Sequence, residues 1–162
     1  MNSVQLPIRL DDKTVLRGIT KVDELRIQEI VFEILPQYGL PVDPEGTDND
    51  LFDIEKSYSG GLFGVVEFEG EVQGSFGLFK MSETVVELRK MYFDQSIRGK
   101  GIAKKLVPIL FDLARQMGFQ KMELETASSL VEAIGLYQSL GFKEVSGENQ
   151  TPRCDKSFEI NL

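Results

Sequence analysis

The 162-residue chain has 26 acidic and 18 basic side chains and a formal net charge of −8, which excludes a general nucleic-acid-binding surface. It contains no histidine, which excludes Ser-His-Asp and Cys-His nucleophilic sites and histidine-ligated metal centres. Cys154 is the only cysteine and no long apolar run or signal-like start is present, so we expect one cytoplasmic domain, residues 1–162, without nucleic-acid or membrane partners.

The first third of the chain is predicted to contain one strand and two helices. Residues 14–19 have the composition of a strand, and apolar residues at helical spacing predict a helix over 22–35 that ends at Pro36. A capping-box pattern predicts a second helix over 47–58. Six acidic residues between 43 and 55 either attract a cationic acceptor or serve this helix start, and the helix start is the better interpretation.

The middle of the chain is predicted to be a run of strands. Residues 62–68 and 72–80 are rich in β-branched and aromatic residues and flank Glu69-Gly-Glu71, which predicts a hairpin. A longer strand over 84–93 leads into a turn that contains two glycines.

The last third alternates helices and strands. One apolar stripe predicts a helix over 101–117 despite Pro108, whose missing donor costs ~3 kcal/mol that packing must offset. A strand over 121–125 and a helix over 130–140 follow, and closing strands are predicted over 142–145 and 157–162. Strands first and a βαβα order later predict a mixed sheet covered by helices.

The turn Arg98-Gly-Lys-Gly-Ile-Ala103 has the composition of a phosphate-binding loop. Glycines let a backbone approach an anion, and the first amides of the next helix have no intrahelical partner. The Walker pattern fails here, because Gly101 is preceded by Lys100 and followed by Ile102. A dinucleotide fingerprint starting at Gly99 places Lys104 where a third glycine belongs, so a small oxidoreductase is a weak alternative.

Three segments together resemble the GNAT superfamily of N-acetyltransferases in order and spacing. These are Glu87-Leu-Arg-Lys-Met-Tyr-Phe93, the turn 98–103 and Leu136-Tyr-Gln-Ser-Leu-Gly-Phe142, with Arg98 first in the R/Q-x-x-G-x-G/A signature. The resemblance implies an α/β (α+β) fold with a mixed, mostly antiparallel central sheet, helices on both faces and a splayed strand pair at the cofactor site. It also implies a homodimer.

By this resemblance the chain transfers an acetyl group from acetyl-CoA directly to a primary amine, without a metal. The acceptor is a small-molecule or peptide amine. A local excess of five positive charges between residues 95 and 121 suits the phosphates of coenzyme A. The cofactor-binding residues implied are Met91, Tyr92, Phe93, Arg98, Gly99, Lys100, Gly101, Ile102, Ala103 and Lys104.

Two further residues are candidates for proton transfer. The resemblance and the absence of histidine both favour a carboxylate as the acceptor of the amine proton, directly or through water. Glu87 lies on the strand before the turn, on the same side as Arg89 and Met91 by alternation. Pairing with Arg89 or Lys90 is an equal interpretation, and Glu83 and Glu125 are further candidates.

Tyr137 matches the residue that protonates the departing thiolate in the resembling family. The other interpretation is a packing tyrosine with a satisfied hydroxyl. The alternative function for the whole chain is a non-catalytic coenzyme A-binding sensor or interaction module.

Overall fold

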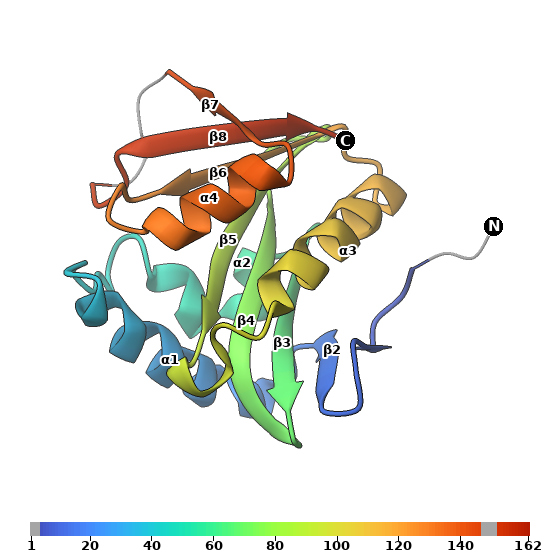
Figure 1. Cartoon of the computed structure of the whole chain (residues 1–162), viewed down its shortest axis with the longest axis vertical. Coiled ribbons are helices and arrows are strands. Elements are labelled where there is room, and N and C mark those ends of the chain that lie inside the picture. The colour runs from blue at the N-terminus through green and yellow to red at the C-terminus, as the bar shows by residue number, and fades with distance from the viewer. Residues whose placement is uncertain (1–3, 147–151) are drawn as a thin grey trace.

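The computed structural model describes residues 4–146 and 152–162 as a single twisted sheet flanked by helices (Figure 1). Within those residues the strands are β1 (Ile8–Arg9), β2 (Thr14–Gly18), β3 (Leu62–Phe68), β4 (Glu71–Lys80), β5 (Val85–Phe93), β6 (Lys121–Thr126), β7 (Lys143–Val145) and β8 (Lys156–Asn161). The α-helices are α1 (Glu24–Gln37), α2 (Ile54–Ser57), α3 (Ile102–Gln116) and α4 (Val131–Ser139). None of the described helices is long and apolar enough to cross a bilayer.

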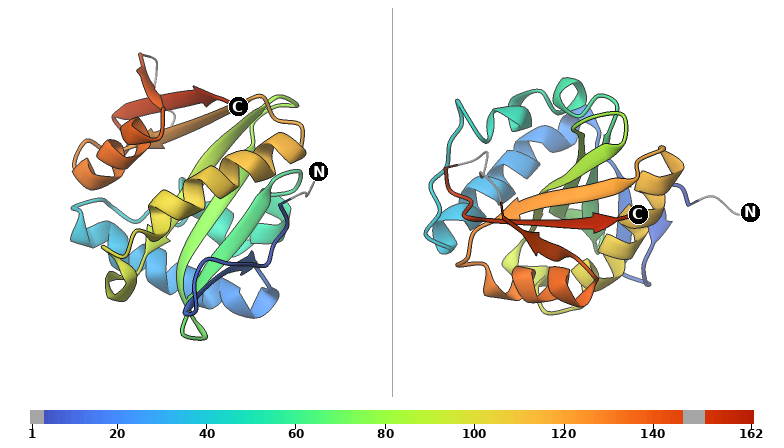
Figure 2. Two further views of the ribbon diagram at one scale, coloured as in Figure 1. Left: turned by 45° about the vertical axis from the view of Figure 1, so that its right-hand side comes forward. Right: turned by 90° about the horizontal axis from the view of Figure 1, so that it is seen from above.

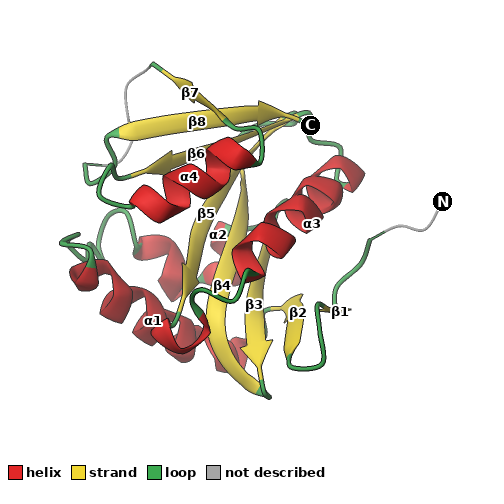
Figure 3. Ribbon diagram, viewed as in Figure 1, coloured by secondary structure: helices red, strands yellow, loops and turns green. Residues whose placement is uncertain are grey.

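The strands follow the order β1-β2-β3-β4-β5-β6-β8-β7, and every neighbouring pair is antiparallel except β5 and β6. Helices lie on both faces (Figure 3), with α1 and α2 on one face and α3 on the other in the turned views of Figure 2. The predicted mixed, mostly antiparallel sheet with helices on both faces is therefore confirmed. The short strand β1 gave no recognisable sequence signal.

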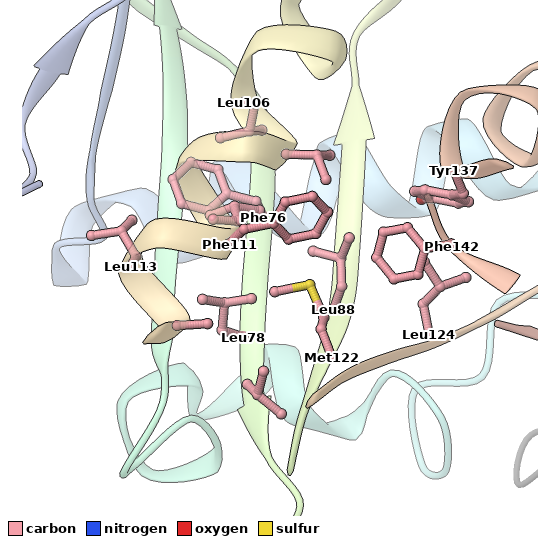
Figure 4. Close-up of a cluster of buried hydrophobic side chains, with 14 of the residues drawn as sticks. Phe76, Leu78, Leu88, Leu106, Phe111, Leu113, Met122, Leu124, Tyr137 and Phe142 are labelled. Atoms are coloured by element: carbon pink, nitrogen blue, oxygen red, sulfur yellow. The ribbon is translucent and has the colours of Figure 1, made fainter. Parts of the chain in front are cut away.

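Two apolar clusters hold these layers together. The larger one packs α3 and Tyr137 of α4 against β4, β5 and β6, and Figure 4 shows Leu106 and Phe111 of α3 above Phe76 and Leu78 of β4. The smaller cluster packs α1 and α2 on the opposite face around Val65. Leu106, Val107 and Leu110, within two residues of Pro108 on α3, are fully buried, so packing outweighs the lost hydrogen bond and the helix continues.

The predicted helix over 47–58 is wrong as one continuous element. The structure has a 3₁₀ turn, Asn49–Phe52, followed by the single-turn helix α2. The carboxylate of Asp50 is buried against the Tyr58 hydroxyl, so it cannot cap a helix start at Thr47. Asp53 instead accepts a hydrogen bond from the backbone N–H of Lys56 and begins α2.

A β-bulge interrupts β5. Arg89 pairs with Gly77 and Tyr92 with Ser75, so the register shifts between them, and Lys90 has a φ of 52°. The buried hydroxyl of Ser75 donates a 2.7 Å hydrogen bond to the Lys90 carbonyl and satisfies a group that the ladder leaves unpaired.

The bulge changes which side chains share a face. Arg89 lies over Phe79 of the smaller cluster, and Lys90 contacts Asp48 and Asp50 on that same side. Met91 packs instead with the larger cluster on the opposite face. The expected alternation of Glu87, Arg89 and Met91 on one side is therefore wrong for Met91, because the extra residue in the bulge shifts every later side chain of β5 to the other face.

Gly77 of β4, which pairs with Arg89 beside the bulge, has no room for a side chain. A Cβ there would lie 2.8 Å from Tyr58 Cε1 and 3.2 Å from the carbonyl oxygen of Arg89. We expect Gly77→Ala to lower the free energy of unfolding by about 1–3 kcal/mol, because the overpacked ring and backbone must move. Urea unfolding measures the change. Gly18→Ala is the control, because its Cβ would meet no atom within 4 Å, and equal stability of the two variants would contradict the prediction.

Candidate active site

The candidate site is a cavity of about 950 Å³ between β5 and β6. Residues 85–87 pair in parallel with residues 121–123, and no pairing continues beyond them. Figure 1 shows β6 and β8 running at a steep angle to β3, β4 and β5. Residues 88–93 and 124–126 line the resulting opening, so the predicted splayed strand pair is present.

The glycine turn forms one end of this cavity. Gly99 and Gly101 both have a φ of 75°, and Gly101 is the residue before α3. Nothing lies within 4 Å of the Cβ position of either glycine, so no side chain covers the backbone there. The amides of the first turn of α3 thus have an open approach beside the cavity.

The residues predicted to bind the cofactor reach the cavity with one exception. Those that line it are Met91, Tyr92, Phe93, Arg98, Gly99, Gly101, Ile102, Ala103 and Lys104. The Lys100 side chain does not line it and lies with its Nζ 5.3 Å from the centre of the Phe68 ring. Arg98 donates hydrogen bonds to the Phe93 carbonyl, at 2.9 Å, and to the Gln37 side chain, at 3.1 Å, and so ties the turn to β5 and α1.

These features fit an extended phosphorylated cosubstrate such as acetyl-CoA. The cavity volume is at the upper end of the range for ligand sites. A helix start with uncovered glycine backbone suits a pyrophosphate, and the backbone of residues 91–93 borders the gap through which a thioester arm would run. Among the described residues, no group of three or more Cys, Asp or Glu side chains is placed to hold a metal ion.

Tyr137 lies on α4 and its side chain reaches the same cavity. The ring packs edge-on against Phe142 at 5.6 Å between centroids, as Figure 4 shows. Burial, and to a lesser extent the neighbouring Tyr92, raises the pKa of the Tyr137 phenol, and no hydrogen bond contributes to that shift. The ring is a packing residue, but the hydroxyl remains protonated at neutral pH and accessible from the cavity.

Glu87 is the last residue of β5 that pairs with β6, at the point where the cavity begins. Its side chain is buried, and Arg89 Nε donates a 2.5 Å hydrogen bond to its Oε1 atom. Burial raises the pKa of the Glu87 carboxyl above its ordinary value, and Arg89 opposes that shift only in part. The predicted ion pair with Arg89 is therefore present, and the role of Glu87 as proton acceptor stays a prediction.

The two other candidate carboxylates differ in position. Glu125 lines the cavity from β6. Glu83 is exposed and pairs with Lys80 at 2.7 Å, outside the cavity. Of the carboxylates singled out from the sequence, Glu87 and Glu125 are therefore the ones that the fold brings to the cavity.

A buried ion network borders the opposite end of the cavity, and sequence reasoning missed it. Lys90 Nζ lies 3.2 Å from a carboxylate oxygen of both Asp48 and Asp50, and Arg153 makes two 2.7 Å hydrogen bonds to Asp48. Burial alone would raise the pKa of Asp48, but the hydrogen bonds from Arg153 and from the Asp43 backbone hold it below its ordinary value. No local sequence signal joins these positions, because the contacting residues are 40 or more positions apart in the chain.

The network also decides the role of the acidic segment between residues 43 and 55. Asp48 is fully buried and Asp50 nearly so, and both are neutralised by Lys90 or Arg153. The side chain of Asp43 accepts a hydrogen bond from the backbone N–H of Thr47. These acids therefore stabilise the segment, which favours the structural interpretation over attraction of a cationic acceptor.

Comparison with known proteins identifies relatives of this chain. A family model described as "Acetyltransferase (GNAT) family" matches residues 27–142. The chain is 41% identical over 138 residues to the uncharacterized N-acetyltransferase YjgM of Escherichia coli strain K12, a match that spans 81% of this chain and 83% of that protein.

Two solved structures have the same fold at low sequence identity. A GNAT-family acetyltransferase from Staphylococcus aureus Mu50 superposes with a TM-score of 0.82 at 21% identity, over 92% of this chain and 99% of the other. A spermidine N-acetyltransferase from Vibrio cholerae, in complex with CoA and spermine, superposes with a TM-score of 0.71 at 18% identity, over 93% and 96% of the two chains.

Proposed function

The chain belongs to the GNAT family of acetyltransferases and is an acetyl-CoA-dependent N-acetyltransferase, and we propose that transfer to a primary amine is direct, with Glu87 as the base and Tyr137 as the acid. The observation that carries the proposal is the shared cavity, which Glu87, Tyr137 and the glycine turn all line. A module that only binds coenzyme A has no need of the buried Glu87 carboxylate and the Tyr137 phenol in one cavity. Catalysis is therefore favoured over the sensor alternative.

The donor would lie along β5 with its phosphates at the glycine turn. Acetyl-CoA supplies the acetyl group in activated form, as a thioester. The first-turn amides of α3 and Lys104 would hold the pyrophosphate, and the backbone of residues 91–93 would pair with the pantetheine arm. Arg98 orients the turn through its contacts with Phe93 and Gln37.

Proton transfer completes the reaction. A primary amine with a pKa of about 10.4 is protonated at neutral pH and must lose two protons to become an amide. Glu87 accepts the first proton, directly or through water, and passes it to solvent before the amine attacks, and it accepts the second as the C–N bond forms. As the C–S bond breaks, Tyr137 donates its proton to the departing sulfur. The protons then exchange with solvent, which restores the Glu87 carboxylate and the Tyr137 phenol.

The remaining assignments concern the whole protein. We propose that residues 1–162 form one N-acetyltransferase domain that acts in the cytoplasm as a homodimer. The single cysteine, Cys154, suits a reducing compartment, and the family resemblance supports the dimer. The acceptor is proposed to be a small-molecule amine, with a peptide amine as the alternative, and the structure with spermine bound supports the first.

The glycine turn gives the first test. We expect Gly101→Val to weaken acetyl-CoA binding at least tenfold, because a side chain would cover the amides at the start of α3. Thermal shift with acetyl-CoA measures this, since ligand binding stabilises the folded state. Gly118→Val is the matched control, because Gly118 also has a positive φ of 95° in open space but does not line the cavity. Equal shifts in both variants would contradict the assignment.

Tyr137→Phe tests the acid. The ring and its packing on Phe142 are kept, so we expect the melting temperature and the KM for acetyl-CoA to stay unchanged. Loss of the proton donor should lower kcat about 10²-fold. Steady-state thiol release measures both constants, and full activity of this variant would remove the role assigned to Tyr137.

Glu87→Gln tests the base through the pH profile. Since burial raises the pKa of Glu87, the wild-type kcat/KM should rise with pH through a limb above the ordinary range of a glutamate, as the carboxyl loses its proton. The variant should lose about 10²-fold in activity and lose that limb. The matched control is Glu83→Gln, an exposed carboxylate outside the cavity. An unchanged limb in the Glu87 variant would be decisive against the assignment.

A further inference from the structure

Three cations border the end of the cavity away from the glycine turn, namely Arg89, Lys90 and Arg153. Two of them are engaged by protein acceptors. Lys90 contacts Asp48, Asp50 and the carbonyl oxygen of Thr47. Arg153 donates hydrogen bonds from both terminal nitrogens to the carboxylate of Asp48. A ligand would have to displace these contacts to use either charge.

Arg89 differs from the other two. Its Nε donates to Glu87, and its guanidinium carbon lies over the Phe79 ring, 3.7 Å from the ring centre. Nη2 approaches only the thioether sulfur of Met81, at 3.9 Å. Among the described residues, the terminal nitrogens of Arg89 donate no hydrogen bond to an oxygen atom.

The Arg89 guanidinium is therefore a fixed donor group facing the cavity with unused N–H bonds. Stacking on Phe79 and the bond to Glu87 hold its plane, and only about a quarter of the side chain is exposed. A carboxylate is the anion whose two oxygens match the planar fork of these unused donors.

We propose that Arg89 binds a carboxylate of the acceptor, so that the acceptor is an amino acid or a close derivative that retains its carboxylate. The inference rests on the proposed transfer to an amine near Glu87. Arg89 and Glu87 are two residues apart on one face of β5, and their side chains are joined by the Nε–Oε1 bond. In an α-amino acid a single carbon separates amine and carboxylate, so one small molecule can reach both side chains.

Charged groups of both signs line this end of the cavity. The acids are Asp43, Asp50, Glu87 and, from β6, Glu125, and the cations are Arg89, Lys90 and Arg153. A molecule with one positive and one negative group complements such a surface. Its negative group would lie at Arg89, whose terminal nitrogens donate to no oxygen atom of the described residues.

The experiment compares amino acids with their decarboxylated amines. Phenylalanine against 2-phenylethylamine, leucine against 3-methylbutylamine and alanine against ethylamine would be assayed by thiol release from acetyl-CoA. For the pair on which the wild type is most active, we expect kcat/KM to be at least tenfold higher for the amino acid than for its amine. A site that forms hydrogen bonds to a carboxylate discriminates against an analogue that lacks the carboxylate. Equal or better activity with the amines would overturn the inference.

Variants at Arg89 assign the preference to that side chain. Arg89→Gln also removes the hydrogen bond to Glu87 and so changes the rate with every acceptor. The readout is therefore the acid-to-amine ratio, which is kcat/KM for an amino acid divided by kcat/KM for its decarboxylated amine. The ratio should collapse to near one in Arg89→Gln and recover in part in Arg89→Lys, which keeps the charge but not the fork. Arg115→Gln, an exposed arginine on α3 paired with Asp112, controls for loss of charge and should keep the ratio.

Failure of the inference differs from failure of the proposed function. Thiol release with amines at a ratio unaffected by Arg89→Gln keeps the acetyltransferase assignment and removes the carboxylate subsite. Release with no acceptor of either set contradicts the proposed function. In that case the carboxylate subsite is tested by measuring how far the amino acids raise the melting temperature of the CoA-saturated protein. A rise that is present in the wild type and lost in Arg89→Gln supports the subsite. No rise in the wild type overturns it.

Discussion

The fold is organised by one constraint on β5, which must stay paired with β4 while leaving β6. The bulge at Lys90 meets this constraint, because an extra residue bends the strand without ending its ladder to β4. Ser75 stabilises the bulge by bonding the carbonyl that it releases. The parting of β5 from β6 opens the cavity, and the bulge keeps Lys90 on the same side of the sheet as Arg89, where both side chains line the cavity.

The ion network around Asp48 then closes that end of the cavity. It joins the segment after α1, the bulge of β5 and the segment before β8, through Asp48, Lys90 and Arg153. Buried pairs contribute little net stability relative to apolar packing, but removing one partner leaves a buried charge and is strongly destabilising. The network therefore acts mainly to hold these three segments in one arrangement, and Arg153 secures the position of the chain before β8.

The environments of the two proposed proton-transfer groups follow from the same geometry. Burial at the point of strand separation raises the pKa of Glu87 toward neutrality, which makes its carboxylate a better base. Burial on α4 keeps the Tyr137 phenol protonated, which suits a proton donor to a departing thiolate. Arg89 joins the proposed carboxylate subsite to the proposed base, because its Nε donates a hydrogen bond to Glu87 while its terminal nitrogens donate to no oxygen atom of the described residues.

The sequence by itself determined most of the elements and the GNAT fold class, and it predicted which residues would bind the donor. Those features depend on local patterns, namely apolar periodicity, a glycine turn before a helix and short ordered motifs that carry the family resemblance. It determined neither the broken helix after residue 47 nor the side of Met91, nor the partners of Lys90 and Arg153. Only the tertiary structure decided these, because a bulge depends on the register of the neighbouring strand and a buried ion network depends on contacts between segments that the sequence keeps far apart.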